Sequence, residues 1–259
     1  MVRGFYNAGS GMVTQEKRLN MISNNLANVT TAGYKKDGVT MSTFGEHIAV
    51  RMNAYQRERT DQIGRGVFMQ TTDIDYTNYS QGGFEMTGRP MDFAIAGEGF
   101  FIVRDYNDVD YFTRDGQFSL DEEGYLVHPG FGRVQGVDGD IIIGTSEFKL
   151  GENGEIYIID WDNDELVYLT QLLIAQPDDY DALHKAPNGM FIPQEYTLGG
   201  IGDSSFTTLQ GHVERSNVNM AMEMTEMIAA QRSLQSASQI LKMYDNMTEQ
   251  SYSRISRIT

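Results

Sequence analysis

The stretch of this sequence that most resembles a chemical site is the acidic segment Asp160-Trp-Asp-Asn-Asp-Glu165. It places carboxylate and amide oxygens at alternate positions, as the first half of a calcium-binding loop does. The sixth position of such a loop needs glycine for its sharp turn, but here it is Glu165. The twelfth position, which normally supplies a bidentate glutamate, is Gln171. The spacing therefore favours an acidic hairpin turn over a metal site.

Other groups that commonly act in catalysis form no recognisable pattern. Histidines occur without the spacing of metal ligands, at His47, His128, His184 and His212. The chain contains neither a glycine-rich phosphate loop nor a nucleophile elbow. Its 36 acidic residues would provide some carboxylate pair at a suitable separation by chance, so composition alone does not indicate glycoside hydrolysis. We therefore expect no enzymatic activity, no cofactor and no metal.

Charge and composition restrict the possible partners. The formal net charge is −16, and residues 37–212 carry 10 basic and 30 acidic residues, whereas both ends of the chain are neutral or basic. A surface of that sign disfavours nucleic acid as a partner. There is no cysteine, so disulfides and thiol chemistry are excluded, and no apolar run is long enough to insert into a membrane. Because no secretory signal is visible at the N-terminus, we expect any export to proceed without a cleaved signal peptide.

A long amphipathic helix is predicted from about residue 218 to the C-terminus, with Ser216 or Asn217 as its N-terminal cap. Two rows of residues repeat every seven positions along it, as in a helix that packs through a heptad seam. The first row contains mostly large residues: Met220, Met227, Leu234 and Leu241. The second row lies three positions later and contains mostly smaller ones: Glu223, Ala230, Ala237 and Tyr244.

The first thirty residues show the same periodicity, and Gly33 offers a left-handed residue after the helix. Steps of three and four from Phe5 reach mostly apolar positions: Phe5, Ala8, Met12, Gln15, Leu19, Ile22, Leu26 and Val29. A helix of this kind is stable only when its apolar stripe is packed. We therefore expect the two ends of the chain to pair as a coiled-coil-like helical domain. The alternative is that both are core helices of an ordinary globular domain.

Short runs with two-residue alternation begin after Met91, for example Phe93/Ile95, Phe101/Val103 and Phe118/Leu120. Between such runs stand turn dipeptides, at Asp115-Gly116, Glu123-Gly124, Asp138-Gly139, Asn153-Gly154 and Asn188-Gly189. Asp-Gly and Asn-Gly between alternating apolar runs indicate β-hairpins with type I′ turns. The predicted class is α+β: a helical domain (1–34 and 213–259), an extended connector with short strands (35–82 and 206–212), and an inserted antiparallel all-β domain (83–205).

Several blocks, taken in order along the chain, resemble the flagellar axial proteins, and among them the rod proteins of the basal body. They are Asn24-Asn-Leu-Ala-Asn-Val-Thr-Thr-Ala-Gly-Tyr-Lys35, Gly97-Glu-Gly-Phe-Phe-Ile102, Phe112-Thr-Arg-Asp-Gly-Gln-Phe-Ser-Leu120, Glu123-Gly-Tyr-Leu126, Leu209-Gln-Gly-His-Val-Glu-Arg-Ser-Asn-Val-Asn219 and Glu223-Met-Thr-Glu-Met-Ile-Ala-Ala-Gln-Arg232. Together they span the chain, which makes chance similarity improbable.

This resemblance implies a structural subunit that stacks helically into a hollow shaft, with the terminal helices as the inner tube and the β domain outside. It also implies location in the flagellar basal body, contacts with copies of itself and with neighbouring rod and hook proteins, and export by the flagellar type III apparatus. The residues expected at the assembly interface are Phe5, Met12, Leu19, Ile22, Leu26, Val29, Met220, Met227, Leu234, Leu241 and Tyr244.

The length of the chain and the block Thr87–Ala96 resemble the proximal and distal rod proteins more than the hook protein. Residues 46–66 differ from the distal-rod pattern, so both rod types stay open. A hook or hook-associated protein is an alternative within the family. A cell-wall-binding or cell-wall-acting β domain on a helical stalk is the alternative of a different class.

Overall fold

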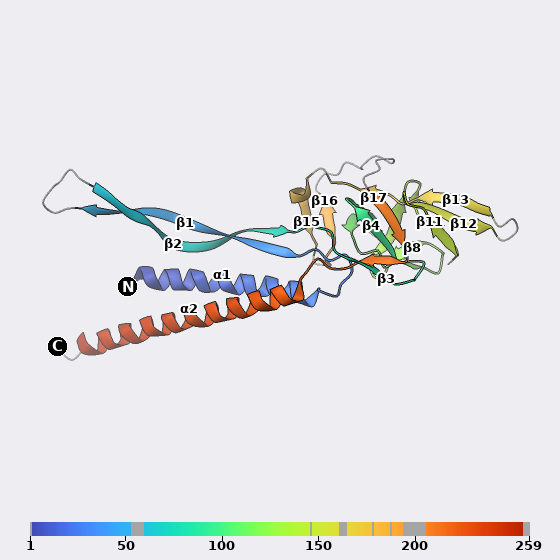
Figure 1. The fold of residues 1–259 in the computed structure, drawn as a ribbon. Helices are drawn as coiled ribbons and strands as arrows, with labels where there is room; N and C mark the ends of the chain where they lie inside the picture. The colour runs from blue at the N-terminus through green and yellow to red at the C-terminus, as the bar shows by residue number, and fades with distance from the viewer. Residues whose placement is uncertain are drawn as a thin grey trace. The chain divides into compact units, whose positions relative to one another are not determined.

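The computed structural model of the 259-residue chain describes residues 2–52, 60–145, 147–160, 165–177, 179–186, 188–193 and 206–255. Figure 1 shows two long helices, one near each end of the chain; the residues that separate them along the sequence form β-strands. The chain forms two compact units. Unit 1 contains residues 1–27, 37–78 and 219–259, and unit 2 contains residues 28–36 and 79–218. The α+β class predicted from the sequence is confirmed.

Unit 1 combines the two helices with a long two-stranded ribbon. Helix α1 is Val2–Ala27 and helix α2 is Met220–Ile255. Strands β1 (Asp37–Met52) and β2 (Thr60–Thr77) are antiparallel, with a register that runs from Asp37↔Thr77 to Met52↔Thr60 and contains two irregularities. These strands are much longer than the short ones expected there. An isolated two-stranded ribbon is only marginally stable in water, so the packing of α1 against both strands supports it.

The start of α2 differs in detail from the prediction. The Asn219 side-chain oxygen accepts a hydrogen bond from the Met222 amide at 3.2 Å, so Asn219 is the N-terminal cap. Ser216 instead accepts from Val218, and Asn217 accepts from the amide of Lys36. The prediction of Ser216 or Asn217 as the cap was therefore wrong by two or three residues, because three polar side chains within four positions could each have filled the role.

Unit 2 is built from short antiparallel strands. The largest sheet has the order β15-β16-β6-β5-β9-β8-β7, with β10 beside β9 and β14 beside β5. A three-stranded sheet has the order β11-β12-β13, and two pairs, β17-β4 and β18-β3, complete the unit. The bounds are β3 Phe84–Met86, β4 Phe93–Gly97, β5 Phe100–Asp105, β6 Asp110–Thr113, β7 Ser119–Leu120, β8 Leu126–His128, β9 Gly132–Gly136, β10 Gly139–Asp140, β11 Phe148–Leu150, β12 Glu155–Asp160, β13 Glu165–Gln171, β14 Ile174–Ala175, the 3-10 helix Tyr180–Ala182, β15 Leu183–Lys185, β16 Phe191–Pro193, β17 Phe206–Gln210 and β18 His212–Glu214.

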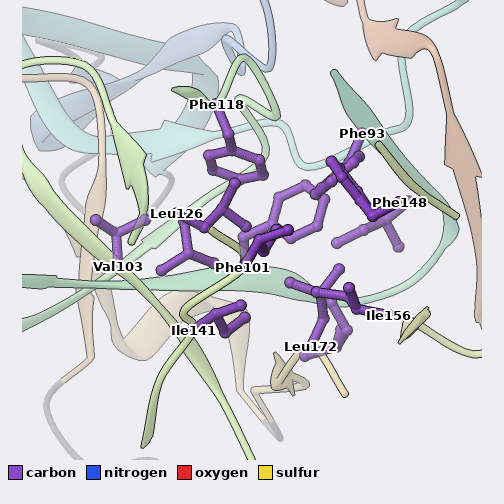
Figure 2. Packing of buried hydrophobic residues seen from close by; sticks show 13 residues of the cluster. Phe93, Phe101, Val103, Phe118, Leu126, Ile141, Phe148, Ile156 and Leu172 are labelled. Carbon is purple, nitrogen blue, oxygen red and sulfur yellow. The ribbon is translucent and has the colours of Figure 1, made fainter. Parts of the chain in front are cut away.

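Strand β5 separates two apolar clusters because successive side chains of a strand point to opposite faces. Phe101 and Val103 belong to the larger cluster, which Figure 2 shows packed around Phe93, Phe118 and Leu126. Phe100 and Ile102, on the other face, belong to a second cluster with other buried residues, among them Phe112 and Phe191. The alternation predicted for Phe93/Ile95 and Phe101/Val103 is confirmed, since all four side chains lie in the larger cluster.

Four of the five predicted hairpins are present, but their turns are not type I′. The hairpin predicted at Asp115-Gly116 is absent from the described part of the chain, because β6 pairs with β5 and β16 whereas β7 pairs with β8. A type I′ turn needs positive φ at both central residues, and Asp108 is the only described non-glycine residue with positive φ. In the turn 121–125, Gly124 donates to the Asp121 carbonyl, Asp121 donates to the Tyr125 carbonyl, and Gly124 has φ of 84°. The segments 151–155 and 186–190 repeat this bonding, which is that of a type I turn followed by a left-handed residue. Asp108 occupies the left-handed position of the turn 105–109.

Candidate functional site

The clearest candidate surface for assembly lies on the two helices of unit 1. Helices α1 and α2 pack against each other and run antiparallel, so both chain ends lie at the same end of the pair (Figure 1). Arg18 forms an ion pair with Glu226 at 3.1 Å. Further along, the Tyr244 ring lies so close to Gly4 that a Cβ on Gly4 would overlap the ring.

The face of α2 that is least exposed corresponds to the two predicted rows. Glu223 and Ala230 are buried. The other residues of the two rows from Met227 to Tyr244 are half-buried: Met227, Leu234, Ala237, Leu241 and Tyr244. Their spacing alternates between four and three residues, as expected for one face of a helix that packs along another helix. Met220, which begins the first row, is 44% exposed.

On α1 the predicted row is divided among different environments. Ile22 is fully buried, and Met12, Leu19 and Leu26 are half-buried. Phe5 is 44% exposed, and Val29 lies beyond the end of the helix, in unit 2. The structure also buries two polar residues of α1, Thr14 and Asn25, which the apolar pattern could not identify.

Asn25 joins three elements of unit 1. Its side-chain oxygen accepts from the Asp37 amide at 3.0 Å, and its side-chain nitrogen donates to the Asp37 carbonyl at 2.9 Å. The same nitrogen lies 3.5 Å from Glu223 Oε2, and Thr77 donates to the Asp37 carboxylate at 3.0 Å. A buried amide satisfied in this way fixes the end of α1 against the start of β1 and the first turn of α2.

A second set of large apolar residues on the helices remains exposed. On α2 they include two groups at helical spacing: Met224 and Ile228, then Ile240, Met243 and Met247. On α1 they are Phe5, Tyr6 and Val13. Apolar side chains that recur every three or four residues outside the packed face indicate a contact surface. Apart from Phe5, these residues were not predicted from the sequence, although their spacing was visible beside the predicted rows.

The histidine and acidic side chains that were examined as possible metal ligands or catalytic groups do not come together in the structure. His128 is buried between the rings of Phe118 and Phe131, with Nε2 3.2 Å from the Asp115 carboxylate. His212 Nδ1 lies 2.8 Å from the Gln210 carbonyl. The described residues contain no group of three or more histidine or acidic side chains suited to a metal. Residues 161–164 of the acidic turn, and the side chain of His47, lie outside the described parts of the chain.

Within the described residues, neither helix is long and apolar enough to cross a membrane.

Three family models match this chain, each over a different part. Residues 5–35 match the model described as flagella basal body rod protein. Residues 94–158 match the flagellar hook protein FlgE/F/G D1 domain. Residues 209–254 match the C-terminal model of the flagellar basal body rod FlgEFG proteins. The three segments contain most of α1, the strands from β4 to β12, and most of α2.

The chain is also similar to individual flagellar proteins. It is 32% identical to the flagellar basal-body rod protein FlgG of Bacillus subtilis, over 96% of this chain and 98% of that protein. It is 28% identical to the rod protein FlgF of Caulobacter vibrioides, over 100% of this chain and 98% of that protein. Similarity to the hook protein FlgE of Borreliella burgdorferi is 32% identity over 56% of this chain but only 34% of that protein.

Proposed function

This chain belongs to the flagellar basal-body rod protein family and is a structural subunit of the flagellar rod and hook assembly, and we propose that it is a rod subunit whose helices contact neighbouring subunits. Similarity to rod proteins over nearly the full length of the chain is the main support for this proposal, and the exposed apolar residues on both helices agree with it. The matched hook protein is about three times longer than the aligned region, which favours a rod subunit over a hook subunit. No comparison supports a cell-wall-acting protein.

We infer that α1 and α2 use two different surfaces. The predicted rows hold the two helices together within one chain in a coiled-coil-like manner, and so shape the element that assembles. The exposed set, together with Met220, contacts other copies of this chain or neighbouring rod and hook proteins. A repeated contact between unlike surfaces that does not close on itself produces a filament. Such a filament would form the hollow shaft that transmits torque.

The distribution of charge supports this division. Unit 2 carries the whole net charge of −16, and unit 1 has equal numbers of acidic and basic residues. Neutral units can pack against copies of themselves without net repulsion, while acidic units remain solvated. We propose in addition that the chain is exported through the flagellar type III apparatus without cleavage of a signal, and that it lies in the part of the rod that crosses the cell envelope; its similarity to rod proteins supports this.

A Met243→Asp substitution tests the exposed set. Met243 is 61% exposed, so the substitution should change the free energy of unfolding of the single chain by less than about 0.5 kcal/mol. It should nevertheless reduce incorporation into basal bodies at least about tenfold, because a carboxylate would be buried between subunits. Incorporation is measured by immunoblotting isolated basal bodies.

Lys242→Asp provides the control, because it places the same carboxylate one residue away, also at an exposed position. Normal incorporation of the Met243→Asp chain would exclude this part of α2 from the subunit contacts.

A further inference from the structure

Three charged side chains are buried together in unit 2. Lys35 and Glu214 are each 1% exposed, and Arg114 is 5% exposed. They come from three distant parts of the chain: the segment 28–36, the residue after β6, and the last residue of β18. Charged side chains are rarely buried to this extent unless they are paired.

The Glu214 carboxylate is the centre of this cluster. Its Oε1 accepts from Lys35 Nζ at 2.6 Å and from the Gly82 amide at 2.9 Å, and its Oε2 accepts from Arg114 Nη1 at 3.1 Å. The two cations make further bonds to backbone carbonyls. Lys35 donates to Ser80 at 3.0 Å, and Arg114 donates to Ile95 at 3.2 Å and to Gly97 at 2.7 Å.

Backbone hydrogen bonds join the same two segments. The Gly33 amide donates to the Glu214 carbonyl at 2.8 Å, and the Asn217 amide donates to the Tyr34 carbonyl at 3.4 Å. The Lys36 amide donates to the Asn217 side chain at 2.7 Å. Residues 33–36 therefore run beside residues 214–217 with a defined alignment.

Stability alone is a poor explanation for this cluster. Two cations share one carboxylate, and burial lowers the pKa of Lys35 from its ordinary value despite the nearby carboxylate of Glu214. Well-packed apolar residues often stabilise a protein as well as a buried ion cluster does. Such a cluster does, however, discriminate strongly between alignments. A shift of one residue in one direction would place Tyr34 where Lys35 now pairs with Glu214, and would leave that carboxylate with one cation fewer. A shift in the other direction would bring in Lys36, and it would break the hydrogen bonds of the Gly33 amide to Glu214 and of the Lys36 amide to Asn217.

The helices themselves specify their alignment less strongly. The rows of α2 repeat every seven residues, so a slip of seven residues would keep most of the apolar contacts with α1 and would break the polar contacts of Asn25 with Glu223 and of Arg18 with Glu226. Helix α1 ends at Ala27, six residues before Gly33, and α2 begins at Met220, three residues after Asn217.

We propose that Lys35, Glu214 and Arg114 form a register lock, which holds the chain after α1 and the chain before α2 in one alignment. The lock acts within a single chain and therefore does not depend on the proposed assembly function. Its residues are positioning residues, because they act through the alignment of the two segments that they join.

The test replaces all three charges with apolar side chains of similar size, as Lys35→Met, Arg114→Met and Glu214→Leu in one full-length chain. Hydrogen exchange of the Gly33, Lys36 and Asn217 amides is measured by NMR relative to the Leu126 amide, which donates to Ile141 in the larger core. We expect the three amides to exchange at least about tenfold faster relative to Leu126, since their alignment is no longer fixed. Their signals should also split into more than one set.

The control is Arg104→Met with Asp110→Leu, which removes a more exposed ion pair of 2.7 Å from the same unit. It should leave the three amides unchanged relative to Leu126. The proposal is overturned if the triple variant keeps one set of signals with unchanged relative exchange. Equal acceleration of all amides, as in a variant that fails to fold, would also overturn it, because the cluster would then contribute to overall stability and not to alignment.

Discussion

Cells whose only copy of this protein carries Ile22→Asp are expected to lose motility. Ile22 is fully buried in α1, and an unpaired carboxylate at such a position costs several kcal/mol, about 4 or more. The packing of α1 in unit 1 should therefore open, and with it the surface that contacts other subunits. Swimming in soft agar and the composition of isolated basal bodies measure the effect.

Asn20→Asp is the matched control, because it adds the same charge to an exposed position of the same helix. It should leave swimming unchanged. Hydrogen exchange of the Leu126 amide should be the same in both variants, since this residue lies in the core of unit 2. Normal swimming with Ile22→Asp would refute the role assigned to the helix packing.

A Gly33→Ala substitution should destabilise the protein by about 3 kcal/mol. Gly33 has φ of 66°, which costs a residue with a side chain about 1 kcal/mol, and overpacking adds roughly 1–3 kcal/mol. The overpacking arises because a Cβ at this position would overlap the backbone of Arg114 and Asp115. Urea unfolding gives the change in the free energy of unfolding.

Gly130→Ala separates the two costs, because Gly130 has φ of 82° but no atom near its hypothetical Cβ. It should cost only about 1 kcal/mol. If Gly33→Ala costs no more than Gly130→Ala, the close approach of the segment 28–36 to Arg114 is not maintained in solution.

The parts of the fold that follow from local periodicity were predictable. Both helices appear where three- and four-residue spacing placed them, and the residues at Phe93, Ile95, Phe101 and Val103 share one core because strand alternation is strict. The dipeptides ending in Gly124, Gly154 and Gly189 marked real turns. Their type was not predictable from the dipeptide, because one left-handed glycine suits a type I turn with a bulge as well as type I′.

The parts that depend on distant partners were not predictable. The long pairing of β1 with β2 was missed because two mixed polar segments become strands only through each other. The burial of Lys35, Glu214 and Arg114 could not be predicted, since charged residues are normally exposed and nothing in a sequence pairs residues so far apart. The assembly interface predicted at the helix rows remains a prediction, because a single chain contains no contact between subunits.

The position of the protein in the flagellum provides the most direct test. Antibodies against unit 2, applied to basal bodies isolated from cells that produce this chain, should label the rod below the hook. The same preparations should contain the protein in many copies. Label confined to the hook, or basal bodies that lack the protein in motile cells, would contradict its assignment as a rod subunit.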